Sequence, residues 1–260
     1  MGYMTRFVTR VDVITMIIQS CILVVVIAKT IKLAVSTKKS IFPFFFALAI
    51  SSYLLSNFYW IAFECLKPET RIPMACNEIS ECAMILLLCA GLESILKDKS
   101  IIAKEIAFAV FYIGANIALW IAWSGDWFQD ILFGIPYVYF LWLLIRGIKS
   151  RGCMSRKELW LATTASIIIF AMQIPQFFAK GNVFDLIEGW NFVMMFALTT
   201  WLGIISFRRK DFFLASTFFF WTELFMFLSG VPYYYMAFFT NTAALLIMYS
   251  LVKKEVAAYG

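Results

Sequence analysis

The segment that decides the fold lies at residues 73–96 and reads PMACNEISECAMILLLCAGLESIL. A helix crosses the hydrocarbon core of a bilayer in about 20 residues, so this segment is long enough to span a membrane. Its first third nevertheless carries Glu78 and Glu81, which are three residues apart and therefore share one face of a helix. Because a carboxylate that faces lipid is costly, both side chains are expected to point into a helical bundle.

The composition of the whole chain places it among integral membrane proteins. Of its 260 residues, 63% are hydrophobic and 15% are charged, which lies outside the range of soluble globular domains. No charged amino-terminal region followed by a short apolar core and a cleavage site is evident, so the first hydrophobic stretch is expected to stay as a helix. The net charge of +6 comes from basic residues in short loops rather than in a patch, which argues against a nucleic-acid partner.

Apolar segments of membrane-spanning length recur along the entire chain. Inside lipid such segments satisfy their backbone hydrogen bonds as helices, and these are too long and too uniformly apolar for barrel strands. The sequence therefore predicts an all-α, polytopic helical bundle that forms one domain over residues 1–260. The nine predicted spans are 12–34, 41–64, 73–96, 101–123, 127–147, 157–179, 184–206, 211–229 and 231–252, of which the last two are either separate spans or one kinked or re-entrant element.

The distribution of basic residues predicts the orientation of the bundle. Lysine and arginine concentrate in alternate connections, and 17 of the 22 fall on one side of the nine-span arrangement. Positively charged loops stay in the cytoplasm, so the amino terminus is predicted outside and the carboxyl terminus inside the cell. The expected location is the cell (plasma or inner) membrane.

A layer of polar side chains is predicted in the outer half of this bundle. Besides the two glutamates of the segment 73–96, Glu223 lies in the carboxyl-terminal half of its predicted helix, where the helix dipole does not stabilise a carboxylate. Acidic groups that face a bundle interior attract cations and amines. The predicted ligand-binding residues are Asn57, Asn77, Glu78, Glu81, Asn116, Gln173, Asn191, Glu223 and Asn241.

Each of these side chains also has a purely structural interpretation. Buried amides often bridge membrane helices through hydrogen bonds, and a protonated Glu223 would fit the same role. Glu78 lies near a helix amino terminus, where the dipole stabilises an acid, whereas Glu81 lies beyond the range of that effect. A ligand site and a set of interhelical bridges are therefore both open interpretations of the same residues.

Two cysteines lie at the ends of consecutive predicted spans. Cys65 ends the second span and Cys76 begins the third, on the side that is predicted to face the oxidising exterior. A disulfide between them is one expectation, and two free thiols are the alternative.

The absence of histidine from the sequence narrows the chemistry. Without histidine, His-based zinc sites, Ser-His or Cys-His nucleophiles and histidine ligation of haem are excluded. The sequence contains neither a phosphate-binding glycine loop nor a dinucleotide fingerprint, and no cofactor is predicted.

Three classes of function remain. The preferred class is a transporter or ligand-binding membrane protein with an acidic, outward-facing pocket for a cation, a proton or an amine-bearing solute. The second is an intramembrane hydrolase that uses Glu78 and Glu81 as paired carboxylates. The third is a non-catalytic subunit or sensor of a larger complex, with another membrane protein as its partner. The lipid bilayer and a small cationic solute or protons are the expected partners of the preferred class.

Overall fold

The computed structural model describes the chain at residues 2–37, 40–66, 76–96, 103–107, 109–111, 114, 127–176, 178–228 and 233–259. Within these ranges the chain consists of helices joined by short connections, and no strand occurs among them. The prediction of an all-α fold is therefore confirmed for the described part of the chain.

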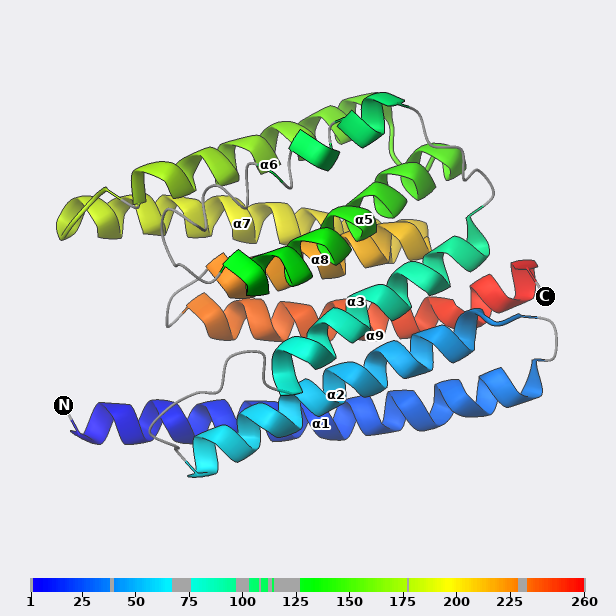
Figure 1. The fold of residues 1–260 in the computed structure, drawn as a ribbon, viewed down its shortest axis with the longest axis horizontal. Coiled ribbons are helices and arrows are strands. Elements are labelled where there is room, and N and C mark those ends of the chain that lie inside the picture. The colour runs from blue at the N-terminus through cyan, green and yellow to red at the C-terminus, as the bar shows by residue number, and fades with distance from the viewer. Residues whose placement is uncertain are drawn as a thin grey trace. The chain divides into compact units, whose positions relative to one another are not determined.

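Eight helices have defined bounds within these residues (Figure 1). Residues 103–107 and 109–111 are helical as well. The eight are α1 (Gly2–Ser36), α2 (Phe42–Leu66), α3 (Cys76–Ile95), α5 (Trp127–Arg151), α6 (Arg156–Gln176), α7 (Asn182–Arg209), α8 (Phe212–Leu228) and α9 (Tyr233–Tyr259).

Five stretches of the described helices are long and apolar enough to cross a membrane, which makes this chain a membrane protein with transmembrane helices. Helix α3 is not one of these five, because its 20 residues include three glutamates, Glu78, Glu81 and Glu93. The number of crossings and their orientation stay predictions. The five stretches are Val13–Ser36, Phe42–Leu66, Arg156–Gln176, Asn182–Arg209 and Tyr233–Ala258, and α8 adds a shorter apolar helix at Phe212–Met226.

The chain divides into two compact units. Unit 1 comprises Met1–Leu143 together with Glu255–Gly260, and unit 2 comprises Leu144–Lys254. Helices α5 and α9 each contribute residues to both units. Because two continuous helices belong partly to each unit, the division does not separate two independent segments of chain. A single domain over residues 1–260 stays a prediction.

In unit 1, helix α2 packs against both α1 and α3 (Figure 1). The buried face of α2 carries Phe42, Phe46 and Ile50, and α3 contributes Met84. A Cβ atom on Gly91 of α3 would lie 3.5 Å from the Phe42 ring, so this ring rests directly on the α3 backbone. Such close contacts between small and large residues hold helices together where lipid supplies no hydrophobic driving force.

In unit 2, helix α7 packs against both α6 and α8. Helix α8 is the most deeply buried, and every side chain from residue 212 to 216 is buried. A Cβ atom on Gly203 of α7 would lie 3.0 Å from the Phe218 ring, and one on Gly147 of α5 would lie 1.9 Å from the Phe213 ring. Only glycine fits at position 147, because the ring occupies the space that any side chain would need.

Polar groups satisfy the helix termini at one end of unit 2. Ser155 and Glu158 form a capping box at the start of α6, in which the Ser155 N–H donates to Glu158 Oε2 at 2.7 Å and the Glu158 N–H donates to Ser155 Oγ at 3.3 Å. Asp211 caps α8 by accepting a 2.9 Å hydrogen bond from the Phe213 N–H. The same carboxylate forms a 3.2 Å ion pair with Arg151 at the end of α5.

Two further basic side chains join this polar end. Arg209 donates hydrogen bonds to Glu158 and to the backbone carbonyl of Cys153. Lys254 of α9 donates to the carbonyl of Lys210, a residue whose φ of 51° reverses the chain between α7 and α8. The end of α5, the start of α6, the turn between α7 and α8 and the last part of α9 in unit 2 are therefore bound together.

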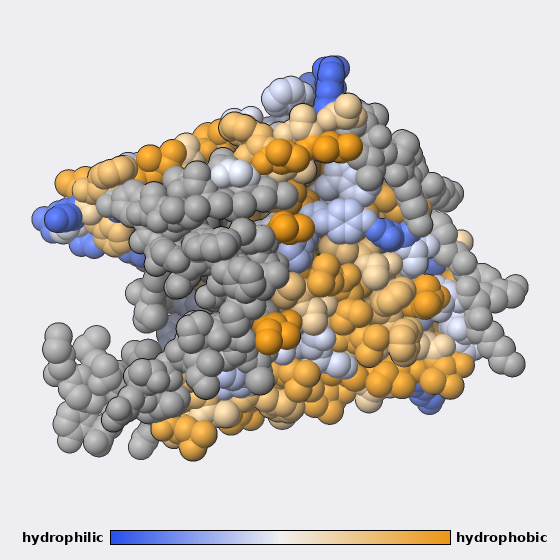
Figure 2. Space-filling view, viewed as in Figure 1, coloured by the Kyte–Doolittle hydropathy of each residue, from blue (hydrophilic) through white to orange (hydrophobic). Residues whose placement is uncertain are grey.

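Large apolar side chains are exposed along the outer faces of the helices. Val35 of α1 is 78% exposed and Trp160 of α6 is 62% exposed. Figure 2 shows broad hydrophobic surfaces over the helices, and the hydrophilic residues form small separate patches. Contiguous apolar surface of this kind fits contact with lipid tails rather than with water.

Candidate functional site

Unit 1 contains a polar cluster that spans three helices, named here the α1–α3 cluster. Its members are Gln19 and Ser20 of α1, Ser56 and Asn57 of α2, and Glu81 of α3. The Asn57 Nδ2 group donates a 2.7 Å hydrogen bond to Gln19 Oε1, and both side chains are buried. A buried amide pair of this kind satisfies polar atoms that would otherwise be stranded in an apolar bundle.

Glu81 supplies the carboxylate of the α1–α3 cluster. The Ser56 hydroxyl donates to Glu81 Oε1 at 3.0 Å, and the glutamate is only half-buried. Glu81 begins a stripe of α3 that continues through the buried Met84 and Leu88, at the spacing of one helix face. The same stripe that packs α3 into unit 1 therefore brings the carboxylate beside α2.

Ser20, the next residue of α1 after Gln19, carries a hydroxyl that makes no hydrogen bond among the described residues. Its oxygen is buried. A buried hydroxyl without a partner costs free energy unless water or a ligand occupies the position beside it. Ser20 follows directly after Gln19, so this unused group lies at the level of the Gln19–Asn57 pair.

Unit 2 contains a second and tighter group, named here the α8–α9 cluster, which consists of Thr222, Glu223 and Asn241. The Asn241 Nδ2 group donates to Glu223 Oε1 at 2.5 Å and lies 3.2 Å from Thr222 Oγ1. Thr222 in turn donates to the carbonyl of Phe219, 2.7 Å away. Glu223 is 1% exposed and Asn241 is fully buried. This carboxyl group is therefore enclosed by protein within unit 2.

Another buried polar side chain in unit 2, Asn191 of α7, makes no hydrogen bond among the described residues. It is 1% exposed, and neither atom of its amide group has a hydrogen-bond partner among the described residues. Its chain neighbour Phe192 stacks on Tyr233 with ring centroids 4.0 Å apart and lies 5.6 Å from the Phe225 ring. Asn191 is therefore a buried amide whose hydrogen-bonding capacity is unused within the described part of the chain.

The remaining predicted residues are placed only in part. Gln173 of α6 is half-buried, and its Nε2 atom is buried without a partner in the described part of the chain. The side chains of Asn77 and Glu78 and the whole of Asn116 lie outside the described residues. Glu81 belongs to unit 1 and Glu223 to unit 2, so a meeting of these two carboxylates around one opening stays a prediction.

The structure brings together some predicted residues and adds partners that sequence reasoning missed. Glu223 and Asn241, both predicted site residues, are hydrogen-bonded to each other. Asn57 is hydrogen-bonded instead to Gln19, which was not among the predicted site residues. A signal for Gln19 existed, because it is the sole amide or charged residue between positions 12 and 29. No comparable signal marks Ser56 or Thr222, because hydroxyls are common in apolar helices.

Thiols and metal ligands add little to the candidate sites. The Cys65 thiol is free and exposed, and the side chain of Cys76 lies outside the described residues, so a disulfide between them stays a prediction. Burial, together with the nearby Asp211 carboxylate, raises the pKa of the Cys153 thiol to about 12, so it stays protonated at neutral pH. Among the described residues, no group of three or more acidic or cysteine side chains is placed to hold a metal ion.

Comparisons with protein-family models, with curated proteins and with solved structures find no match to this chain. Its function is therefore inferred from its own residues.

Proposed function

We propose that this protein is a multi-pass transporter or ligand-binding protein of the plasma membrane, with an acidic site for a small cation, a protonated amine or a proton. The observation that carries this proposal is the α1–α3 cluster, in which the half-buried Glu81 carboxylate accepts a hydrogen bond from Ser56, and the next residue of α2, Asn57, is hydrogen-bonded to Gln19 of α1. Ionisable side chains inside a membrane are costly and mark ion or substrate pathways by default.

The composition of the α1–α3 cluster suits a positively charged ligand. Glu81 offers a carboxylate, and the amides of Gln19 and Asn57 offer carbonyl-type oxygens on the two neighbouring helices. Hard cations and ammonium groups both prefer oxygen ligands of these kinds. Ser20, which follows Gln19 in α1, has one further buried oxygen without a hydrogen-bond partner among the described residues.

The α8–α9 cluster fits a different part of the same function. Glu223 is too enclosed to admit a bulky solute, and its hydrogen bond from Asn241 comes from a neutral amide. A proton can still reach such a carboxyl group whenever unit 2 opens locally. We therefore assign solute binding to Glu81 and proton coupling to Glu223.

The proposed topology has nine crossings, with the amino terminus outside and the carboxyl terminus in the cytoplasm. It is supported by the polar end of unit 2, where Arg151, Arg209 and Lys254 lie together. All three belong to connections that the positive-inside rule assigns to the cytoplasm. The helix ends that carry these residues lie at the same end of unit 2 only if successive helices run in alternating directions.

The enclosure of Glu223 also favours a second candidate, a non-catalytic subunit of a membrane complex. In that case the α8–α9 cluster is an interhelical hydrogen bond that sets the register of two helices and binds nothing. The two candidates predict different effects of Glu→Gln substitutions, which remove the charge but keep the size of the side chain. A transporter should lose uptake, whereas a non-catalytic subunit has no uptake to lose.

The test uses purified protein in proteoliposomes, with uptake measured for a panel of metal cations, polyamines and amino acids, with and without a proton gradient. The proposal expects uptake of a cationic solute by the wild type, and a loss of at least about tenfold in the Glu81→Gln variant, because the ligand loses its counter-charge. In the Glu223→Gln variant, uptake should persist down the solute gradient but no longer respond to the proton gradient.

The matched control is Glu93→Gln, a half-buried glutamate on α3 that lies outside both clusters. It should transport like the wild type. If Glu81→Gln and Glu223→Gln both match the wild type in stability and in every uptake measured, the transport proposal is wrong and the subunit candidate gains.

A further inference from the structure

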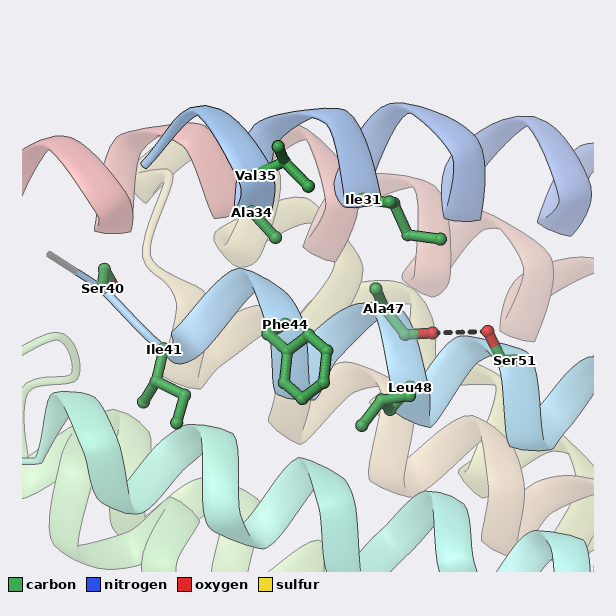
Figure 3. A pocket seen from close by; sticks show the side chains of 9 residues that line it. All are labelled: Ile31, Ala34, Val35, Ser40, Ile41, Phe44, Ala47, Leu48 and Ser51. Atoms are coloured by element: carbon green, nitrogen blue, oxygen red, sulfur yellow. Dashed lines mark hydrogen bonds between the residues drawn. The ribbon is translucent and has the colours of Figure 1, made fainter. Parts of the chain in front are cut away.

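An open apolar groove lies between α1 and α2 in unit 1, and no member of the α1–α3 cluster lines it (Figure 3). It has a volume of about 570 Å³ and is formed by the last turns of α1 and the first turns of α2. Ile31 and Ala34 project from α1 toward α2, and Phe44 and Ala47 line the α2 side. No residue that was predicted to bind a ligand lines this groove.

The lining of the groove matches a hydrocarbon chain. Its large residues are open to the surroundings, with Ile31 48% exposed and Phe44 51% exposed. Ala34 and Ala47 on the facing helices leave room that larger side chains would fill. The Ser51 hydroxyl at one end is bonded to the Ala47 carbonyl at 2.8 Å and adds little polarity. In a bilayer, an exposed apolar groove of this kind lies against lipid tails.

Basic side chains lie on the same turns of α1 as the groove. Lys29 and Lys32 are exposed there, on either side of Ile31, which lines the groove. The stretch from residue 13 to residue 63, which contains most of α1 and nearly all of α2, has no acidic residue. A cluster of lysines beside a membrane helix attracts anionic lipid headgroups.

We propose that this groove binds an anionic phospholipid, with an acyl chain along Ile31 and Phe44 and the phosphate near Lys29 and Lys32 of α1. The site does not depend on the proposed transport function. The groove supplies apolar contact along the chain, and the lysines select the headgroup by charge. A second copy of this protein is a poorer occupant, because it would bring the same lysines and repel them.

The test uses the full-length protein in detergent with phosphatidylglycerol and phosphatidylcholine supplied in equal amounts, and native mass spectrometry counts the lipid retained. The wild type should retain phosphatidylglycerol in preference to phosphatidylcholine. Ala47→Phe, which fills the groove, should lose the bound lipid. Lys32→Gln should lower the preference for phosphatidylglycerol about fivefold, the effect of one lysine near an anionic headgroup.

Two control variants carry the same substitutions elsewhere. Ala171→Phe lies on the exposed face of α6, and Lys180→Gln lies in the connection between α6 and α7. Both should retain lipid like the wild type, and a thermal unfolding curve checks that Ala47→Phe is folded. Equal retention by Ala47→Phe and the wild type, equal binding of the two lipids, or a dimer that Ala47→Phe dissociates would each overturn the proposal.

Discussion

The two polar clusters each hold one membrane carboxyl group, yet they differ in access. In unit 1, Glu81 is half-buried and bound by a serine hydroxyl, with an unused hydroxyl nearby at Ser20. In unit 2, Glu223 is 1% exposed and bound by the amide of Asn241. Two glutamates that look alike in an apolar sequence are therefore suited to different tasks.

The cause of this difference is the position of each helix in its unit. Helix α3 keeps Glu81 at the edge of its buried stripe, where part of the side chain stays accessible. Helix α8 is buried almost throughout, so a carboxyl group on it is enclosed wherever it points. An enclosed carboxyl group needs a fixed partner in the protein, whereas an accessible one is free to exchange partners with a ligand.

The largest expected effect is on chemical reactivity. When the protein in detergent is treated with a hydrophobic carbodiimide, Glu81 should be modified about a hundredfold faster than Glu223, because Glu223 reacts only after local opening of unit 2. Peptide mass spectrometry measures both rates in one sample. Equal rates would remove the distinction between an accessible and an enclosed carboxyl group.

The next effect is on stability. Asn241→Leu should lower the free energy of unfolding by about 3 kcal/mol, because it leaves the buried Glu223 carboxyl group without the amide donor. Glu223→Gln should cost less, since a glutamine oxygen still accepts from Asn241. Titration of mixed micelles with a denaturing detergent measures both changes.

The control for this experiment is Ala243→Leu, two residues along α9 at an exposed position. It should change the stability little. If Asn241→Leu lowers the free energy of unfolding no more than this control does, the hydrogen bonds of the α8–α9 cluster do not stabilise the protein.

The smallest effect is expected in unit 1. Ser56→Ala removes the hydroxyl that donates to Glu81 and should cost only about 0.6 kcal/mol, the average for hydrogen bonds between membrane helices. Ser51→Ala is the control, because the Ser51 hydroxyl donates to the Ala47 carbonyl of its own helix. Its loss should leave the free energy of unfolding almost unchanged. A cost for Ser56→Ala as large as that for Asn241→Leu would reverse the comparison between the two clusters.

The helices were predictable from the sequence, whereas the partners in the clusters were largely not. An apolar segment of about 20 residues identifies a membrane helix without knowledge of its neighbours. A hydroxyl in such a helix usually bonds to the carbonyl four residues earlier, as Thr30 does to Val26. Whether it instead reaches another helix, as Ser56 does, depends on how the two helices are rotated about their axes.

Hydrophobicity and segment length alone determined that this is an all-α membrane protein, and the rarity of carboxylates in such segments singled out Glu81 and Glu223. Only the tertiary structure decided that Glu81 is half-buried beside Ser56 and that Glu223 is enclosed with Asn241. The reason is physical: the cost of burying backbone and charge in lipid acts on each segment separately, whereas the access of a side chain depends on which helices pack around it.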